Sequence, residues 1–129
     1  MNTEIKKHIT DFTAAALATS GAQGINVVPI SVVGSGDSDI FLYDFFMNKT
    51  RANVQENPKV AFTCWKGFVG IQIKGTVSYE TQGDDFDTES AKMKEQFPER
   101  TLFGLLRLTP VQVCDVAPGS AGVQIFPVK

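Results

Sequence analysis

Residues 48–57 combine side chains that can hold a phosphate at the start of a helix. Asn48 can cap a helix N-terminus, and the proline that follows Asn57 forces the helix to end there. Lys49 and Arg51 fall in the first turn, where the partial positive charge of a helix start makes each cation unfavourable by roughly 0.3–1 kcal/mol. An anion held by the free N–H groups, the Lys49 ammonium and the Thr50 hydroxyl would remove this cost, and phosphate fits best.

The alternative interpretation of this segment is an ordinary surface helix with two badly placed cations. A second predicted helix, over residues 84–97, provides a comparison within the same chain. Its first turn carries Asp84, Asp85 and Asp87, which the helix dipole favours. Because the second helix is charged in the favourable sense, the opposite pattern at residues 48–57 indicates a ligand.

The overall composition is that of one soluble globular domain spanning residues 1–129. Hydrophobic residues make up 43% of the chain and charged residues 20%. The net charge of −2 argues against nucleic acid or an anionic membrane as a partner. No apolar run reaches the ~20 residues that span a bilayer, and the first residues lack the apolar core of a signal peptide. We therefore expect a cytoplasmic protein whose two cysteines are reduced.

Strand signals dominate the rest of the chain. A short helix is predicted over residues 3–11, with Thr3 as its cap. Pro110 interrupts the last long strand, where we expect an edge or a bulge. The chain ends in a further apolar stretch at residues 123–128. The predicted strands cover residues 13–19, 25–33, 39–44, 59–65, 68–81 and 101–116.

Six strands with intervening helices in one small domain predict a mainly β fold. We expect a closed or nearly closed antiparallel β-barrel with peripheral helices, and we favour it over a sandwich. No strand–helix–strand rhythm is present, so a doubly wound parallel sheet is not expected.

Two segments of the chain resemble a known family. One is Met47-Asn48-Lys49-Thr50-x-Ala52-Asn53-Val54, which runs into Asn57-Pro58-Lys59-Val60, and the other is Gly70-x-Gln72-Ile73-Lys74-Gly75. Together with the order of elements, they are similar to the FMN-binding split barrels. That group includes pyridoxamine phosphate oxidase and the small bacterial FMN-binding proteins. The resemblance covers roughly residues 13–116 and implies a six-stranded antiparallel split barrel of the FMN-binding type.

The resemblance also implies a cofactor site and a partner. Proteins of this group are typically homodimers with FMN at the subunit interface. Lys49 and Thr50 are expected to grip the FMN phosphate, with Asn53 supporting the same loop. The isoalloxazine ring would lie along residues 29–32, and residues 44–47 would pass the ribityl chain and the ring edge. The expected cofactor-binding residues are therefore Pro29, Ile30, Ser31, Val32, Asp44, Phe45, Phe46, Met47, Asn48, Lys49, Thr50 and Asn53.

The residues themselves support parts of this site and leave alternatives open. Pro29 interrupts the hydrogen-bond ladder of its strand, which frees neighbouring backbone groups for a ligand, but it is equally consistent with an ordinary edge strand. Residues 45–47 are apolar enough to wall a flavin, although without the resemblance they indicate core packing.

No residue is an obvious catalytic acid, base or nucleophile. His8 is the only histidine and is expected on the surface of the first helix, which argues against Ser-His-Asp and Cys-His catalysis and against a zinc site. Pyridoxamine phosphate oxidases carry an arginine–x–histidine pair near the C-terminus. This chain lacks that pair, so we do not expect oxidation of vitamin B6.

Three functions follow from these observations. The first is a small FMN-dependent oxidoreductase that passes electrons from a nicotinamide or protein donor to an acceptor that the sequence does not identify. The second is an FMN-binding electron carrier without a small-molecule substrate. In the third, the barrel binds a deazaflavin or haem, or serves as a cofactor-free module. Lys49 favours a phosphate-bearing ligand over haem and does not separate FMN from a deazaflavin.

Overall fold

The computed structural model describes residues 1–127, which contain eight strands and three helices. The helices are α1 (Thr3–Thr10), α2 (Asn48–Glu56) and α3 (Asp84–Gln96). The strands are β1 (Ala14–Gly21), β2 (Gly24–Pro29), β3 (Val33–Ser35), β4 (Ile40–Asp44), β5 (Lys59–Lys66), β6 (Val69–Glu80), β7 (Gly104–Asp115) and β8 (Gln124–Phe126).

The strands form one antiparallel sheet that curls back on itself. Its order is β2-β1-β5-β6-β7-β4-β3, and β8 pairs with β7 outside this path. The two edge strands, β2 and β3, are consecutive in the sequence and are joined only by residues 30–32. This short link closes the barrel covalently at a place where no strand ladder closes it, and we refer to residues 30–32 as the seam.

The mainly β split-barrel prediction is confirmed, but the number of strands is corrected from six to eight. The predicted strand at residues 25–33 is two strands, β2 and β3, separated by the seam. The chain has to leave one sheet edge and join the other there, which a pattern of β-branched residues does not reveal. The other additional strand, β8, lies in the apolar ending, whose last predicted residue, Val128, falls outside the described residues.

Pro110 produces the irregularity that the sequence predicts. Gly75 on β6 pairs with Pro110, whereas the preceding residue, Lys74, pairs with Gln112. The register therefore shifts by one residue, and Val111 is the extra residue on β7. A β-bulge accommodates the missing N–H of proline and increases the local twist of the long β6–β7 ribbon.

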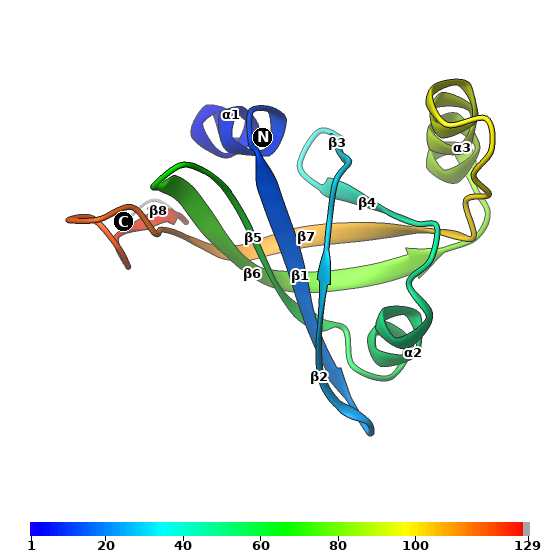
Figure 1. Cartoon of the computed structure of the whole chain (residues 1–129), viewed down its shortest axis with the longest axis horizontal. Coiled ribbons are helices and arrows are strands. Elements are labelled where there is room, and N and C mark those ends of the chain that lie inside the picture. Colours follow the sequence, from blue (N-terminus) through cyan, green and yellow to red (C-terminus); the bar gives the residue numbers. More distant parts are fainter. Residues whose placement is uncertain (128–129) are drawn as a thin grey trace.

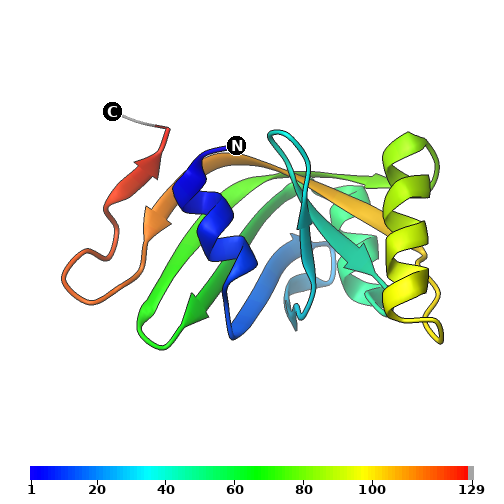
Figure 2. The ribbon, with the colours of Figure 1, turned by 90° about the horizontal axis from the view of Figure 1, so that it is seen from above.

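The helices cover different parts of the barrel (Figure 1). Seen from above, α1 crosses the sheet on one side while α3 stands at the opposite end of the long strands (Figure 2). Asn2 caps α1, since its side chain accepts hydrogen bonds from the N–H groups of Glu4 and Ile5; the prediction of Thr3 as the cap is wrong. Within residues 1–127, no helix combines the length and apolarity that crossing a bilayer requires.

The interior consists of two hydrophobic clusters on opposite faces of β4. Ile40 and Leu42 point into the barrel core, which also contains residues of α1, β1, β5, β6 and β7. The alternate residues Phe41 and Tyr43 belong to a smaller cluster with Met93 of α3. All five residues of β4 are buried for this reason. The seam contributes to both clusters, because Ile30 packs into the barrel core and Val32 packs against the cluster under α3.

Closure of the barrel should depend on Ile30. Its N–H donates to the carbonyl of Ala15 (2.9 Å), and its side chain is buried. We expect Ile30→Ala to lower the free energy of unfolding by about 2–4 kcal/mol, measured by urea denaturation, because it leaves a cavity at the seam. Val69→Ala is the control: Val69 is 57% exposed, so its replacement should cost within about 0.5 kcal/mol. Equal effects of the two variants would contradict this role of the seam.

Candidate functional site

Helix α2 begins in a way that the sequence only partly predicts. Asn48 is the first helical residue, Met47 occupies the cap position, and no side chain caps the helix. The prediction that Asn48 is the cap is therefore wrong. The Met47 N–H instead donates to Oδ1 of Asp44 (2.8 Å), which lies three residues upstream at the end of β4. The N–H groups of residues 48–50 have no partner within the helix, as in the first turn of any helix.

Arg51 is not a badly placed cation, because it has a carboxylate partner. Its Nε lies 2.6 Å from Oδ2 of Asp44. Only Lys49, which is exposed, remains as a cation of the first turn without an ion pair in the described chain. The electrostatic argument for an anion at this helix start therefore rests on Lys49 and the free N–H groups, without Arg51.

Asp44 connects three elements from a fully buried position. Its side chain is 0% exposed and accepts hydrogen bonds from Met47 N–H, Arg51 Nε and the Tyr79 hydroxyl (2.6 Å). Burial alone would raise the pKa of this carboxyl, but the hydrogen bonds from Arg51, Tyr79 and Met47 outweigh burial and lower it. Burial and the neighbouring Asp44 carboxylate raise the pKa of Tyr79 to about 12.

Gly104 makes the approach of Tyr79 to Asp44 possible. Gly104 pairs with Asp44 across β4 and β7, and a Cβ at this position would overlap the Tyr79 ring. The next residue back, Phe103, donates its N–H to the Asp44 carbonyl (2.9 Å), and the Arg51 guanidinium carbon lies 5.1 Å from the Phe103 ring centroid. The sequence gives no signal for these contacts, since they join residues far apart along the chain.

Thr50 and Asn53 fasten α2 to the barrel. Thr50 is 1% exposed and accepts a hydrogen bond from Nδ2 of Asn26 on β2 (3.1 Å). Asn53 is also buried and donates from Nδ2 to the Thr19 hydroxyl on β1 (3.1 Å). The Thr50 side chain is therefore buried, and its hydroxyl oxygen is in contact with Asn26.

A cavity of about 290 Å³ brings the two predicted ring-binding segments together. One wall consists of the end of β2 and the seam, and the other consists of the end of β4 and its link to α2. Asp44 and the α2 residues Asn48, Lys49, Thr50 and Asn53 do not line this cavity, although α2 begins directly after its wall. The lining residues are Val28, Pro29, Ile30, Ser31, Val32, Tyr43, Phe45, Phe46 and Met47.

Val28 and Tyr43 are the members of this wall that the sequence analysis missed. The Tyr43 hydroxyl points away from the barrel and donates to Oε1 of Glu89 on α3 (2.6 Å), and Glu89 in turn pairs with Lys92. Burial and the hydrogen bond to Glu89 raise the Tyr43 pKa. Gly34 on β3 leaves room for this hydroxyl. The alternation of β4, which sends Tyr43 and Phe45 to the same face, was the available signal.

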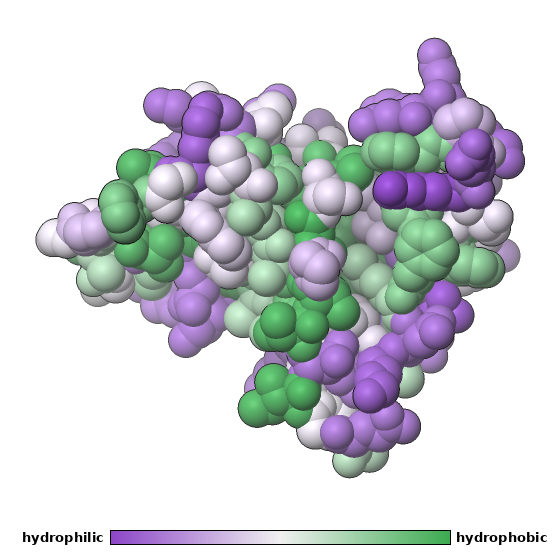
Figure 3. Space-filling model, in the orientation of Figure 1, coloured by the Kyte–Doolittle hydropathy of each residue, from purple (hydrophilic) through white to green (hydrophobic). Residues whose placement is uncertain are grey.

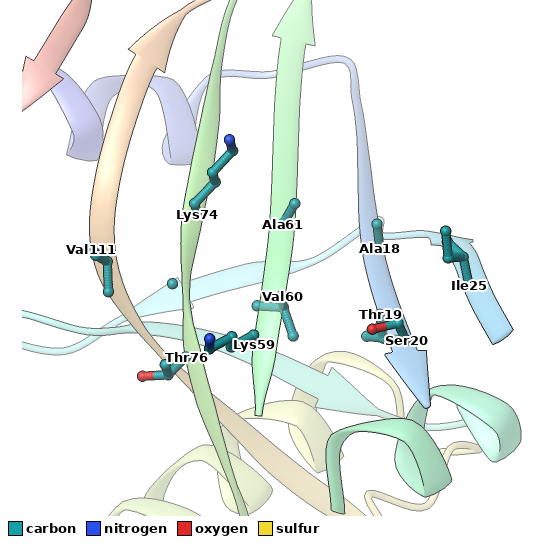
Figure 4. Close-up of a pocket in the computed structure, with 11 residues that line it drawn as sticks. Ala18, Thr19, Ser20, Ile25, Lys59, Val60, Ala61, Lys74, Thr76 and Val111 are labelled. Carbon is teal, nitrogen blue, oxygen red and sulfur yellow. The ribbon is translucent and has the colours of Figure 1, made fainter. Parts of the chain in front are cut away.

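A second, more open groove of about 460 Å³ lies on the outer face of the sheet. In Figure 4, Ala18, Ala61 and Lys74 come from adjacent strands, with Val111 and Ile25 on the two sides of the groove. Ile25 is 84% exposed and Val111 is 59% exposed. Figure 3 shows further apolar side chains over β2, where Val27 is also exposed. These residues together form an exposed apolar surface on the outer face of the sheet.

Comparison with known proteins identifies the family. The model of the pyridoxamine 5'-phosphate oxidase family matches residues 1–118. The chain belongs to this family. An uncharacterised protein of Methanocaldococcus jannaschii is 36% identical over 73 residues, which cover 53% of this chain and 49% of that protein. The chain thus matches about half the length of this relative.

Several solved structures share the fold of this chain. HupZ from group A Streptococcus has a TM-score of 0.81 at 18% identity, over 94% of this chain and 98% of its own. An FMN-binding protein from Syntrophomonas wolfei has a TM-score of 0.74 at 24% identity, over 86% and 82%. HutZ, described as the heme storage protein of Vibrio cholerae, has a TM-score of 0.68 at 21% identity, over 87% and 92%. The names of the last two proteins, which share this fold, refer to different cofactors.

The residues at the site fit a flavin nucleotide. The cavity walls are mostly apolar, as a ring system requires, and Ser31 and Val32 lie outside any strand, so no ladder takes up their backbone groups. The α2 start offers N–H donors and Lys49 directly beyond the wall. At about 290 Å³ the cavity is at the lower limit for small-molecule sites.

The connection through Asp44 should be visible in the pH dependence of stability. Because its folded pKa is lowered, the stability that Asp44 contributes is present above its ordinary value of 3.8 and is lost as the pH falls through the lowered pKa. We expect Asp44→Asn to cost about 2–5 kcal/mol at pH 7, because it removes a buried carboxylate that accepts three hydrogen bonds, and to flatten the acid limb of the stability curve.

The measurement is urea denaturation from about pH 7 down to about pH 2, because the stability that Asp44 contributes is lost below its ordinary pKa of 3.8. Asp11→Asn is the control, since Asp11 forms an exposed ion pair with Lys66 and should cost less than about 1 kcal/mol. An unchanged acid limb in Asp44→Asn would show that Asp44 does not hold the helix start.

Proposed function

We propose that this protein binds FMN and acts as a small oxidoreductase. The observation that carries the proposal is the cavity between the seam and the β4–α2 link, whose apolar walls end at a helix start bearing Lys49. The ring system and the phosphate are the two ends of a flavin mononucleotide. The cavity would hold the ring system, and the helix start would hold the phosphate. When bound, the flavin would supply the electron transfer.

The protein residues would bind and orient the cofactor. Lys49 and the N–H groups of Asn48, Lys49 and Thr50 would hold the phosphate, while the side-chain hydrogen bonds of Thr50 and Asn53 keep α2 in position. Pro29, Ile30, Ser31 and Val32 would lie along one face of the ring, with Phe45, Phe46 and Met47 at its edge. Asp44 does not line the cavity and would act indirectly, because its contacts fix the first turn of α2.

We further propose that the protein is a homodimer in which a second copy covers the outer groove of the sheet. The exposed residues Ile25 and Val111 and the small side chains of Ala18 and Ala61 form a surface against which another sheet can pack closely. A dimer would also supply the second wall that a cavity of about 290 Å³ lacks. The proposed compartment is the cytoplasm, in keeping with the free thiols of Cys64 and Cys114.

The proposed electron donor is a nicotinamide or a protein, and neither the sequence nor the cavity identifies the acceptor. An electron carrier without a small-molecule substrate would use the same site. A deazaflavin would satisfy the same phosphate contacts, because Lys49 and the helix start bind the phosphate and not the ring.

The first experiment is a visible absorption spectrum of the purified protein, with chromatography of any cofactor that heat releases. A yellow protein with FMN in stoichiometric amount supports the proposal. Release of a deazaflavin would support the phosphate site but would show that the bound ring system is not that of FMN. A haem spectrum, or a colourless protein that takes up no added FMN, contradicts the flavin assignment.

Lys49 should contribute to FMN affinity without contributing to folding. We expect Lys49→Ala to weaken FMN binding by ~1–3 kcal/mol, because it removes a charge-assisted hydrogen bond to the phosphate, with little change in thermal stability. The measurement is quenching of flavin fluorescence during titration. Lys6→Ala on α1 is the control and should leave the affinity unchanged. If Lys49→Ala keeps the full affinity, the phosphate lies elsewhere.

The proposed dimer predicts a mutation that separates the subunits. Val111→Lys places a third cation beside Lys59 and Lys74 in the outer groove, so we expect a monomer by size-exclusion chromatography with light scattering. Val116→Lys is the control, because Val116 is exposed but does not line the groove. A wild-type monomer, or a dimer that survives Val111→Lys, would show that this face is not the interface.

A further inference from the structure

A cavity of about 520 Å³ lies between the end of α1 and the seam, and we refer to it as the α1 cavity. In Figures 1 and 2 the chain that runs from the seam into β3 lies between α1 and α3. The walls come from the end of α1 and the α1–β1 link, from the seam and from the last residue of α3. Among the lining residues are Thr10, Phe12, Thr13, Ser31, Val32 and Gln96. The volume falls within the range of small-molecule sites.

The α1 cavity borders the cavity proposed for the flavin ring. Residues 29–32, which are Pro29 and the seam, line both cavities. Ser31 and Val32 belong to no strand, so the segment that the cavities share has backbone groups outside the strand ladders. A compound bound in the α1 cavity would therefore lie beside a ring bound in the other cavity.

The α1 cavity carries no charge on its walls. Among the described residues, no charged side chain lines it. By contrast, Lys59 and Lys74 line the outer groove, and Lys49 stands at the start of α2. A charged ligand that entered the α1 cavity would lose hydration without gaining an ion pair, which is unfavourable. The cavity therefore favours an uncharged ligand.

The free polar side chains of the α1 cavity are hydrogen-bond donors. The hydroxyls of Thr10 and Thr13 already donate to backbone carbonyls. The Ser31 hydroxyl and the Gln96 side-chain amide are exposed and have no hydrogen-bond partner within residues 1–127. Both can donate to a carbonyl oxygen of a ligand, and Phe12 supplies an aromatic surface for a ring.

We propose that the α1 cavity binds an uncharged ring compound with carbonyl groups, such as a quinone, and that it is the acceptor site of the proposed oxidoreductase. The acceptor role rests on the proposed function, whereas the binding does not. As the acceptor, a quinone would take up two electrons and two protons and leave as the hydroquinone. The electrons would come from the reduced flavin across residues 29–32, the nicotinamide or protein donor would replace them, and water would supply the protons.

The binding is tested by titrating the full-length protein, as purified, with duroquinone and recording nuclear magnetic resonance spectra. Duroquinone is uncharged and fully methylated, so it has no free ring position that the free cysteines could attack. We expect saturable shifts of the backbone amide signals of Ser31 and Val32. Anthraquinone-2-sulfonate carries the same two carbonyl groups and a fixed negative charge, and it should bind about tenfold more weakly or less. Absence of a saturable shift, or equal binding of the sulfonate, would overturn the proposal.

Substitutions of single glutamines provide matched variants. Gln96→Leu removes one hydrogen-bond donor and should weaken duroquinone binding about two- to tenfold. Gln82→Leu is the control, because Gln82 is exposed and does not line the cavity, and it should leave the affinity within about twofold. Equal effects of the two variants would contradict the site.

The acceptor role has a separate test. Protein that carries FMN is reduced by light in the absence of oxygen and mixed with duroquinone. We expect the absorbance of oxidised flavin to return at a rate that saturates with the quinone, and Gln96→Leu should raise the half-saturating concentration by the same factor as in the titration. A rate that does not saturate, or that Gln96→Leu leaves unchanged, would show that the α1 cavity is not the acceptor site. A protein that takes up no FMN would contradict the proposed function and leave the titration result standing.

Discussion

Asp44 is the residue on which the arrangement of the site depends. A carboxylate with no exposure to water is stable only if hydrogen bonds and an opposite charge replace its hydration, and here the replacements come from three places: the backbone of Met47, the guanidinium of Arg51 and the hydroxyl of Tyr79. These groups belong to the start of α2, the body of α2 and the long strand β6. One buried charge therefore fixes where a helix begins and how it lies against the barrel.

The barrel supplies the second constraint, because its sheet does not close through hydrogen bonds. The edge strands β2 and β3 are tied by the seam alone, and the adjacent link from β4 to α2 faces it across the cavity. Residues that leave a strand ladder have free backbone groups, and this is where a ligand can use them. The opening in the sheet and the candidate site are consequently the same place.

Local patterns were enough to predict most of the elements. The strands at 59–65 and 68–81 and the helix at 84–97 were confirmed within a few residues, since alternation, acidic first turns and terminating prolines act over short distances. The bulge at Pro110 was predictable because a missing N–H has a fixed consequence in a ladder. The wall formed by residues 29–32 and 45–47 was expected from the family resemblance, and the residues alone supported only parts of it, through Pro29 and the apolar side chains of residues 45–47.

What the sequence could not show depends on how separate elements pack together. Asp44, the partner of Arg51, is near it in the sequence but lies at the end of strand β4, and nothing in the spacing distinguishes a helix cation paired with a buried carboxylate from one without a partner. The division of residues 25–33 results from closing the barrel. The room that Gly104 leaves for the Tyr79 ring arises from the register of three strands, β4, β7 and β6.

The seam also makes the candidate cavity a point of thermodynamic linkage. Ile30 belongs to the barrel core and Val32 to the cluster under α3, so one short segment is part of two packed units. A molecule bound against that segment would stabilise the state in which both clusters are packed, relative to states in which either has come apart. The barrel and α3 would then unfold more nearly as one cooperative unit when the site is filled.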